Sequence, residues 1–265
     1  MKASGTGPGC WALGAMAGLA LATVSPGSAA ADCRLALAVG LDRSASVDAD
    51  ELRLMVEGTA RALEDDAVRA AFLDLPAHPV DLAIFEWSGI GYQRLILDWT
   101  TVRSDAALDD AAEALRARLR PPAPGAAPAD VPPSETAIGS AMLYAATLLE
   151  RRSGCWRRVL DLAGDGRSNA GPLPDAVPFA PGGGPATVNA LVIGIPEGRG
   201  GDPGLAELTS YFRAHVLRGP GAFLQGAEGF GDVREAMVRK LLRELAVTVG
   251  TGDTPRLPGR RKGRG

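Results

Sequence analysis

The sequence predicts an α/β fold with a mostly parallel sheet, because continuous apolar runs alternate with helical patterns along the chain. The runs at 35–41, 159–163 and 187–195 have the composition of strands buried on both faces, as in parallel sheets. Between these runs, apolar residues recur every three or four positions, which is typical of a helix that lays one face on a sheet. A short link at 88–91 joins two further strands and predicts one antiparallel pair at the sheet edge.

The first half of the chain gives its elements in the order strand, helix, strand, strand, helix. Asp48 and Glu51 stand three residues apart, as in a capping box that starts a helix. Apolar residues from Leu52 to Leu63 then follow the helical spacing. The remaining expected elements of this half are strands at 80–87 and 92–99 and a helix at 106–119. This order agrees with an α/β layer architecture.

The second half begins with a long Pro- and Ala-rich loop at 121–135, and long loops of this kind are disproportionately functional. Thr136 opens the helix that follows, whose apolar face runs from Ile138 to Leu149. Prolines and glycines at 171–185 leave room only for a short or distorted crossover helix. The remaining expected elements are strands at 159–163, 187–195 and 221–224 and helices at 205–212 and 233–247.

The chain has 265 residues, and its 46% hydrophobic content supports a real core. Residues 1–31 carry an early lysine, an apolar run at 11–24 and small residues at the end, which predicts a secretory signal peptide. That run is short for a membrane span, which needs about 20 residues. We therefore expect a periplasmic or secreted domain at 32–249, followed by a disordered basic tail at 250–265.

Polar oxygens occur abruptly where two of the predicted core strands end. Asp42, Ser44 and Ser46 alternate directly after the first strand. Asp165 follows a later core strand, within a Gly-Asp-Gly turn. In open α/β sheets, ligands bind beyond the carboxyl ends of the strands, so these hard oxygen donors can converge on Mg²⁺, Mn²⁺ or Ca²⁺. These residue types are also common in turns and helix caps, so a purely structural role stays open, above all for Thr136.

The sequence Asp42-Arg43-Ser44-Ala45-Ser46, with Thr136 and Asp165-Gly166 downstream, resembles the metal-ion-dependent adhesion site of von Willebrand factor type A domains. The resemblance covers about residues 33–248 and is strongest toward a secreted bacterial branch of that family. It implies a doubly wound sheet with helices on both faces. The implied metal ligands are Ser44 and Ser46 directly, and Asp42, Thr136 and Asp165 directly or through water. In the family, an acidic side chain of a partner protein fills the open position.

One departure from the family pattern is Ala45, because many members have glycine at this position. Alanine takes little additional room, but its Cβ restricts the backbone conformations of the turn between the two serines. We therefore expect this loop to be more restricted than in the members that have glycine.

The resemblance also implies a disulfide. In the implied fold, the strands that follow Cys33 and Cys155 are parallel neighbours, so the two cysteines would meet at the amino end of the sheet. Neighbouring strands supply the Cα separation that a disulfide needs, and we predict the bridge Cys33–Cys155. Two buried free thiols are the alternative, which an oxidising compartment disfavours.

The leading hypothesis is a protein-binding module rather than an enzyme. The sequence has no Gly-x-Ser-x-Gly elbow and no phosphate loop, and its two histidines, His78 and His215, stand outside any catalytic pattern. The net charge of −3 gives no argument for a nucleic-acid partner. Two alternatives stay open: the same fold binding partners without metal, and a metal-dependent hydrolase that uses the same acidic cluster.

Overall fold

The computed structural model describes residues 33–120, 132–194 and 204–246. The predicted signal peptide at 1–31, the tail at 250–265 and most of the Pro- and Ala-rich loop lie outside the described residues. Among the helices that are described, none is long and apolar enough to cross a membrane.

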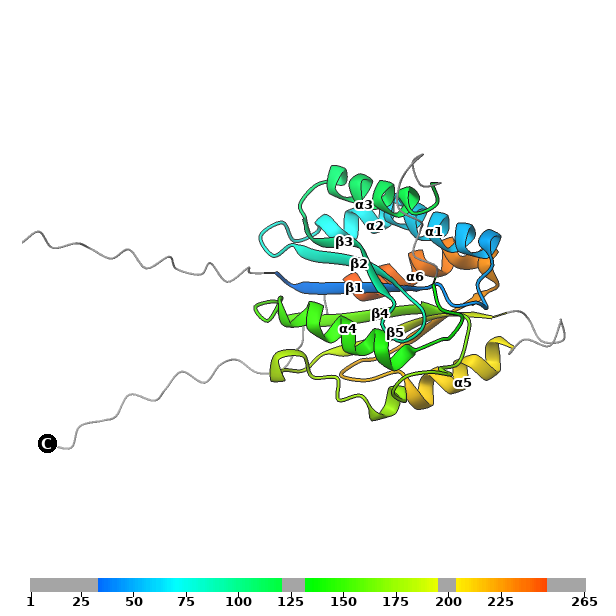
Figure 1. Cartoon of the computed structure of the whole chain (residues 1–265). Helices are drawn as coiled ribbons and strands as arrows, with labels where there is room; N and C mark the ends of the chain where they lie inside the picture. The colour runs from blue at the N-terminus through cyan, green and yellow to red at the C-terminus, as the bar shows by residue number, and fades with distance from the viewer. Residues whose placement is uncertain (1–32, 121–131, 195–203, 247–265) are drawn as a thin grey trace, which may run out of the picture. The chain divides into compact units, whose positions relative to one another are not determined.

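A six-stranded sheet forms the centre of the domain, with the strand order β3-β2-β1-β4-β5-β6 (Figure 1). The strands are β1 Leu35–Asp42, β2 Val80–Trp87, β3 Gln93–Val102, β4 Arg157–Gly164, β5 Thr187–Gly194 and β6 Leu224–Glu228. All neighbours pair in parallel except β2 and β3, which form an antiparallel pair at one edge. The predicted α/β class, with a mostly parallel sheet and one antiparallel edge strand, is therefore confirmed.

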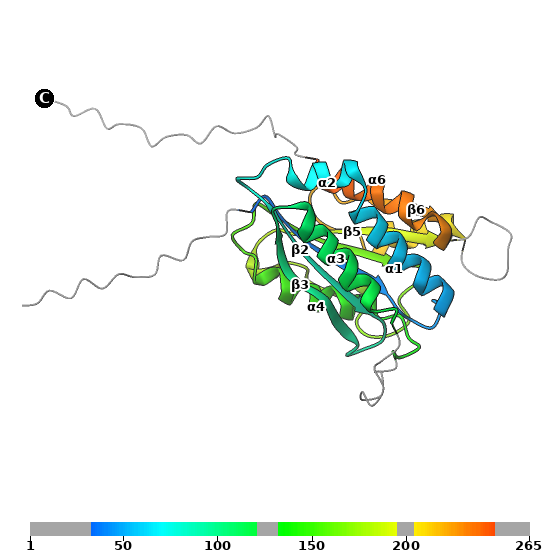
Figure 2. The same ribbon diagram turned by 90° about the horizontal axis from the view of Figure 1, so that it is seen from above.

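Helices cover both faces of the sheet, as the doubly wound fold requires (Figures 1 and 2). One face carries α1 Ala49–Leu63, α2 Asp66–Leu73, α3 Asp105–Ala117 and α6 Val233–Leu245. The other face carries α4 Ile138–Glu150 and α5 Leu205–His215, with the 3-10 helices η1 Pro174–Ala176 and η2 Pro181–Gly183 beside α4. A third 3-10 helix, η3 Phe230–Asp232, leads into α6. The crossover between β4 and β5 is reduced to η1 and η2, because its prolines prevent a longer helix.

One helix, α2, is missing from the prediction. It begins three residues after the last residue of α1, so its apolar positions read as a continuation of that helix. The interruption comes from Asp65, whose side chain caps α2 by accepting hydrogen bonds from the backbone N–H groups of Ala67 and Val68. Val68 and Phe72, four residues apart, are then buried in the core that α1 and α6 share.

The last strand also differs from the prediction, since it runs over Leu224–Glu228 rather than 221–224. Gly219 and Gly221 adopt left-handed φ angles of 83° and 68°, so the chain is still turning where the sequence predicts the strand. After this turn, β6 pairs in parallel with the carboxyl-terminal part of β5.

A disulfide joins Cys33 and Cys155 beside the amino ends of β1 and β4, as predicted. The two strands are hydrogen-bonded neighbours, and the Cα atoms of the cysteines lie 4.7 Å apart, within the usual range for a disulfide. Asp81 lies beside them, with all three potential ligand atoms within 4.8 Å of one another. This cluster is not a metal site, because the sulfur atoms are bonded to each other and Asp81 pairs with Arg152 at 2.9 Å.

A buried charge cluster fixes α6 to the sheet. Lys240 and Glu244 of α6 are both 0% exposed, and their charged groups lie 3.2 Å apart. Lys240 also pairs with Asp161 in the middle of β4, and Glu244 accepts a hydrogen bond from the Asn189 side chain on β5. Burial and the nearby Glu244 charge raise the pKa of Asp161 to about 8, against the opposing effect of Lys240. Asp161 is therefore a structural residue, since removing one partner of a buried pair leaves the other uncompensated.

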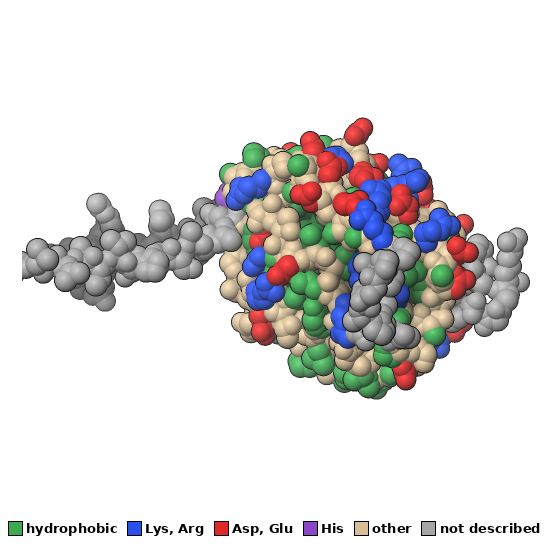
Figure 3. All heavy atoms as spheres, turned by 45° about the horizontal axis from the view of Figure 1, so that its top comes forward, with side chains coloured by type: hydrophobic (Ala, Val, Ile, Leu, Met, Phe, Trp, Pro, Cys, Tyr) green, Lys and Arg blue, Asp and Glu red, His purple; other side chains and the backbone are tan. Residues whose placement is uncertain are grey.

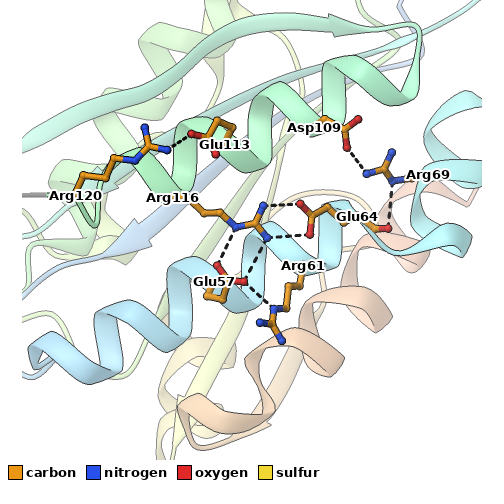
Figure 4. Close-up of polar contacts among 8 residues, drawn as sticks. All are labelled: Glu57, Arg61, Glu64, Arg69, Asp109, Glu113, Arg116 and Arg120. Atoms are coloured by element: carbon orange, nitrogen blue, oxygen red, sulfur yellow. Dashed lines mark hydrogen bonds and ion pairs between the residues drawn. The ribbon is translucent and has the colours of Figure 1, made fainter.

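The layer of α1, α2 and α3 carries a network of ion pairs, and Figure 3 shows acidic and basic side chains interspersed over this surface. Arg116 of α3 lies between two carboxylates, contacting Glu57 in the middle of α1 at 3.0 Å and Glu64 just after its last residue at 2.5 Å (Figure 4). Hydrogen bonds from Arg116 hold the pKa of both glutamates below its ordinary value. Arg116 therefore ties α3 to α1 at neutral pH.

Removal of the disulfide should lower the stability of the domain. We expect the Cys33→Ala/Cys155→Ala variant to lose about 2–5 kcal/mol of unfolding free energy, mainly because its unfolded chain is less constrained. Urea denaturation of the oxidised protein and of the variant measures the difference. Wild-type protein reduced with dithiothreitol is the control and should match the variant. Equal stability of the oxidised protein and the variant would contradict the prediction.

Substitution of Arg116 should reduce the acid sensitivity of the domain. The pKa values of Glu57 and Glu64 are lowered in the folded protein, so their stabilising effect is complete above the ordinary value of 4.5. It is lost as the pH falls through the lowered values. We expect Arg116→Met to cost about 1–2 kcal/mol at neutral pH and little in strong acid, measured by urea denaturation across the pH range.

The matched control for this prediction is Arg61→Met. The Arg61 side chain is 60% exposed and pairs with Glu57 within the same helix, so we expect its loss to cost less than about 0.5 kcal/mol. An Arg116 variant with the same loss of stability at every pH would show that its guanidinium acts through packing rather than charge.

Candidate metal centre

The candidate site lies where the strand order of the sheet reverses, between β1 and β4, and open α/β sheets bind ligands at such points. Asp42 is the last residue of β1, and Asp165 follows the last residue of β4. Ser44 and Ser46 lie in the loop between β1 and α1, and Thr136 lies two residues before α4. Three distant segments of the chain therefore place the predicted residues at one end of the sheet.

A continuous chain of polar contacts links four of these residues. The Ser44 backbone N–H donates to Asp42 Oδ1 at 2.8 Å. The Ser44 and Ser46 Oγ atoms lie 3.1 Å apart, and the Ser46 hydroxyl donates to Asp165 Oδ1 at 2.7 Å. The loop after β1 and the turn after β4 are thus connected through side-chain oxygens.

The loop forms its turn with Ala45 in place of the glycine that many family members have. Ala45 is exposed, and its N–H donates to the Ser134 carbonyl at 3.2 Å. The Val47 N–H donates to the Ser44 carbonyl at 3.0 Å, which closes the turn. This turn carries Ser44 and Ser46, whose hydroxyls contact each other, and the Ser46 hydroxyl contacts Asp165.

Thr136 lies beside this chain of contacts, next to the glycine that follows Asp165. A Cβ placed on Gly166 would lie 3.5 Å from Thr136 Oγ1 and 3.7 Å from Ser46 Oγ, so both hydroxyls border the same space. The capping role considered for Thr136 is wrong, because Ala137 is the N-cap of α4 and no side-chain cap bond forms there. The Thr136 hydroxyl is therefore not used to start the helix.

Asn169 clamps the backbone of Thr136, and the sequence pattern does not single it out. Its Oδ1 atom accepts a hydrogen bond from the Thr136 N–H at 2.8 Å, and its own N–H donates to the Thr136 carbonyl at 2.9 Å. The Ser168 hydroxyl adds a longer contact to the same carbonyl at 3.3 Å. Asn169 escapes detection from sequence because asparagine in a Gly- and Pro-rich region is an ordinary turn residue.

Asp42 is the electrostatic centre of the site. It is 0% exposed, and no described residue donates a hydrogen bond to its Oδ2 atom. Burial first, and the Asp165 charge second, raise the pKa of Asp42 to about 7, while hydrogen bonds from Ser44 oppose the rise. A Cβ on Gly164 would lie 2.9 Å from Oδ2, so glycine is required beside this carboxylate. The unsatisfied Oδ2 atom of Asp42 fits a bound cation, and so does the neighbouring carboxylate of Asp165.

The donor set of the site favours particular ions. Two carboxylates and three hydroxyls are hard oxygen donors, which suit Mg²⁺, Mn²⁺ or Ca²⁺ better than Zn²⁺. Asp42, Ser44 and Thr136 are buried, whereas Ser46 is exposed and Asp165 is partly exposed. A ligand therefore reaches the site from the side of Ser46 and Asp165.

Comparisons with known proteins agree with the fold. No curated protein matches the chain. Proximal thread matrix protein 1 from the mussel byssus aligns with a TM-score of 0.50 at 15% identity, over 81% of this chain and 48% of its own. The pilus adhesin SpaC from Lactobacillus rhamnosus GG aligns with a TM-score of 0.51 at 11% identity, over 80% of this chain and 30% of its own. This chain spans less than half of either protein, and identities this low show the fold alone.

Family membership rests on a match over most of the chain. The family described as protein of unknown function DUF1194 matches residues 32–249. The fold that the sequence resemblance implies is confirmed: the chain belongs to the DUF1194 family and has the von Willebrand factor type A fold.

Proposed function

We propose that this protein is an exported binding module that holds a divalent cation and engages an acidic side chain of a partner protein. The proposed ligands are Asp42, Ser44, Ser46, Thr136 and Asp165. Mg²⁺ is the expected ion, with Mn²⁺ or Ca²⁺ as substitutes. The observation that carries the proposal is the buried Asp42 Oδ2 atom, which has no described donor within a site of converging oxygens. A cation satisfies that atom and relieves the repulsion between the two carboxylates.

The roles of the residues follow from their chemistry and exposure. Ser44 and Ser46 supply neutral hydroxyl oxygens, while Asp42, Thr136 and Asp165 bind directly or through water. When bound, the ion supplies an open coordination position that accepts a carboxylate oxygen. Asp42, Ser44 and Thr136 are buried and hold the ion on its inner side. The partner approaches over Ser46 and Asp165, which are accessible.

Catalysis that depends on histidine is disfavoured, because both histidines of the chain are engaged elsewhere. The His78 ring packs at a tilt against Trp156, with ring centroids 4.4 Å apart, and Trp156 precedes β4 at the end of the sheet opposite the site. His215 lies 3.1 Å from the Asp175 carboxylate on the surface. A hydrolase with histidine as its general base would need that side chain near the ion, and neither histidine occupies that position.

Export is supported by two independent features. The Cys33–Cys155 disulfide is typical of proteins that leave the reducing cytoplasm. The sequence at 1–31 has the charged start, apolar run and small-residue end of a secretory signal peptide. We therefore expect the domain to work in the periplasm or outside the cell.

Calorimetric titration of Mg²⁺ and Mn²⁺ into the oxidised protein tests the metal centre. We expect saturable binding that falls by more than about 100-fold in Asp42→Ala and in the double variant Ser44→Ala/Ser46→Ala, because each removes oxygen ligands. Ser210→Ala, which removes an exposed hydroxyl of α5, is the control and should bind as wild type. Partner binding that persists in Asp42→Ala and in EDTA would favour the metal-independent alternative.

Asn169→Ala should weaken metal binding without removing a ligand. Its side-chain oxygen holds the Thr136 N–H, so we expect Mg²⁺ affinity to fall about tenfold in the same titration. Ser168→Ala is the matched comparison, since the contacts of its hydroxyl with described residues are long, at 3.3 and 3.4 Å. We expect the Mg²⁺ affinity of this variant to change less than about threefold. Wild-type affinity in Asn169→Ala would show that Thr136 is positioned without it.

A further inference from the structure

An apolar recess opens directly beside the candidate metal centre. It has a volume of about 350 Å³ and lies between α1, the end of β5 and η3. Leu54, Ile193 and Phe230 form its apolar wall, and Ser46 and Asp165 form the wall that it shares with the metal centre. This volume is at the lower end of the range for ligand pockets, about 300–1,000 Å³, and suits a side chain rather than a cofactor.

Two of the three side chains of the apolar wall, Leu54 and Phe230, are accessible, whereas Ile193 is buried and only 1% exposed. Leu54 of α1 is 37% exposed, whereas the next two residues of the helix, Met55 and Val56, are buried in the core. Phe230 is only partly buried and packs against the edge of the same core. An accessible apolar surface that adjoins a polar site is a common feature of binding surfaces.

Three of the glycines that line the recess, Gly194, Gly229 and Gly231, differ in how far they tolerate substitution. Gly229 adopts a left-handed φ of 85°, and a Cβ on Gly194 would lie 2.7 Å from the Leu205 Cα, so backbone geometry requires glycine at both positions. Gly231 differs, because a Cβ there would meet no atom within 4 Å. Gly231 lines the recess, and a larger side chain at this position is sterically allowed.

The position of the recess constrains what a partner can present. The Ser46 hydroxyl and Asp165 Oδ1 are 2.7 Å apart and belong to both the metal centre and the recess, so a carboxylate bound at the centre lies at the recess edge. An extended peptide advances about 3.3–3.6 Å per residue, so a side chain one or two residues away reaches the recess. The carboxylates of Glu51 and Asp165 line it as well and disfavour a second acidic side chain there.

We infer that the partner presents a short acidic and apolar motif. An aspartate or glutamate binds at the cation, and an aliphatic or aromatic side chain within two residues of it fills the recess. This inference rests on the proposed function, because the cation fixes where the acidic residue lies. Leu54 is then a specificity-determining residue that contacts the partner and is not among the metal ligands.

An immobilised library of synthetic pentapeptides, with a central glutamate and varied neighbours, tests this inference. The oxidised protein is applied in Mg²⁺ or in EDTA, and we expect Mg²⁺-dependent enrichment of aliphatic or aromatic neighbours. Leu54→Asn should bind the enriched peptides about tenfold more weakly, because it loses one partly buried apolar contact. Its Mg²⁺ affinity should stay unchanged. Leu95→Asn is the matched control, since Leu95 is 38% exposed on β3, and it should bind as wild type.

Gly231→Leu provides a second variant, so that the test does not depend on the folding of one protein. It should also weaken peptide binding while Mg²⁺ affinity stays unchanged. Selection of glutamate without an apolar neighbour, or the same apolar preference in both variants, would overturn the inference and leave the proposed function intact. No saturable Mg²⁺ binding and no Mg²⁺-dependent selection by wild type would refute the proposed function, and the inference with it.

Discussion

Seven consecutive residues of β1 pair in parallel with β4, and this pairing brings functional side chains together at both ends of the two strands. At the amino end, it brings Cys33 within disulfide distance of Cys155. At the carboxyl end, it brings Asp42 close enough to Asp165 for their charges to interact. The strand order reverses at the same pair, so the following segments pack on opposite faces and leave the strand ends accessible to a ligand.

Two buried aspartates on these strands show how the surroundings of a charge decide its role. Asp161 and Asp42 are almost equally buried, and burial raises the pKa of each, to about 8 and about 7. Asp161 has Lys240 as a buried counter-charge, which makes it part of the joint between β4 and α6. Asp42 has the Asp165 carboxylate as its charged neighbour instead, and none of the ion pairs among the described residues includes it. The same residue type is structural in one position and open to a cation in the other.

The candidate centre is asymmetric, and this asymmetry gives a partner one direction of approach. Asp42 and Thr136 are buried, and Asn169 holds the Thr136 backbone through two hydrogen bonds. Ser46 and Asp165 lie on the accessible side, next to the apolar recess. A buried polar site beside an apolar recess is suited to recognising a charged side chain together with an adjacent apolar side chain. The polar contact determines orientation, and the apolar contact adds specificity.

The sequence by itself determined the features that arise within one element. Apolar periodicity located the strands and most helices. The capping box of Asp48 and Glu51 starts α1 as predicted. The polar residues at the strand ends indicated the candidate site. Only the tertiary structure decided that Lys240 is fully buried, that Asn169 clamps Thr136, and where β6 begins and the recess opens. Periodicity reports which face of an element is apolar. Polar contacts between distant segments depend on how the packed elements bring them together, and no local pattern encodes that.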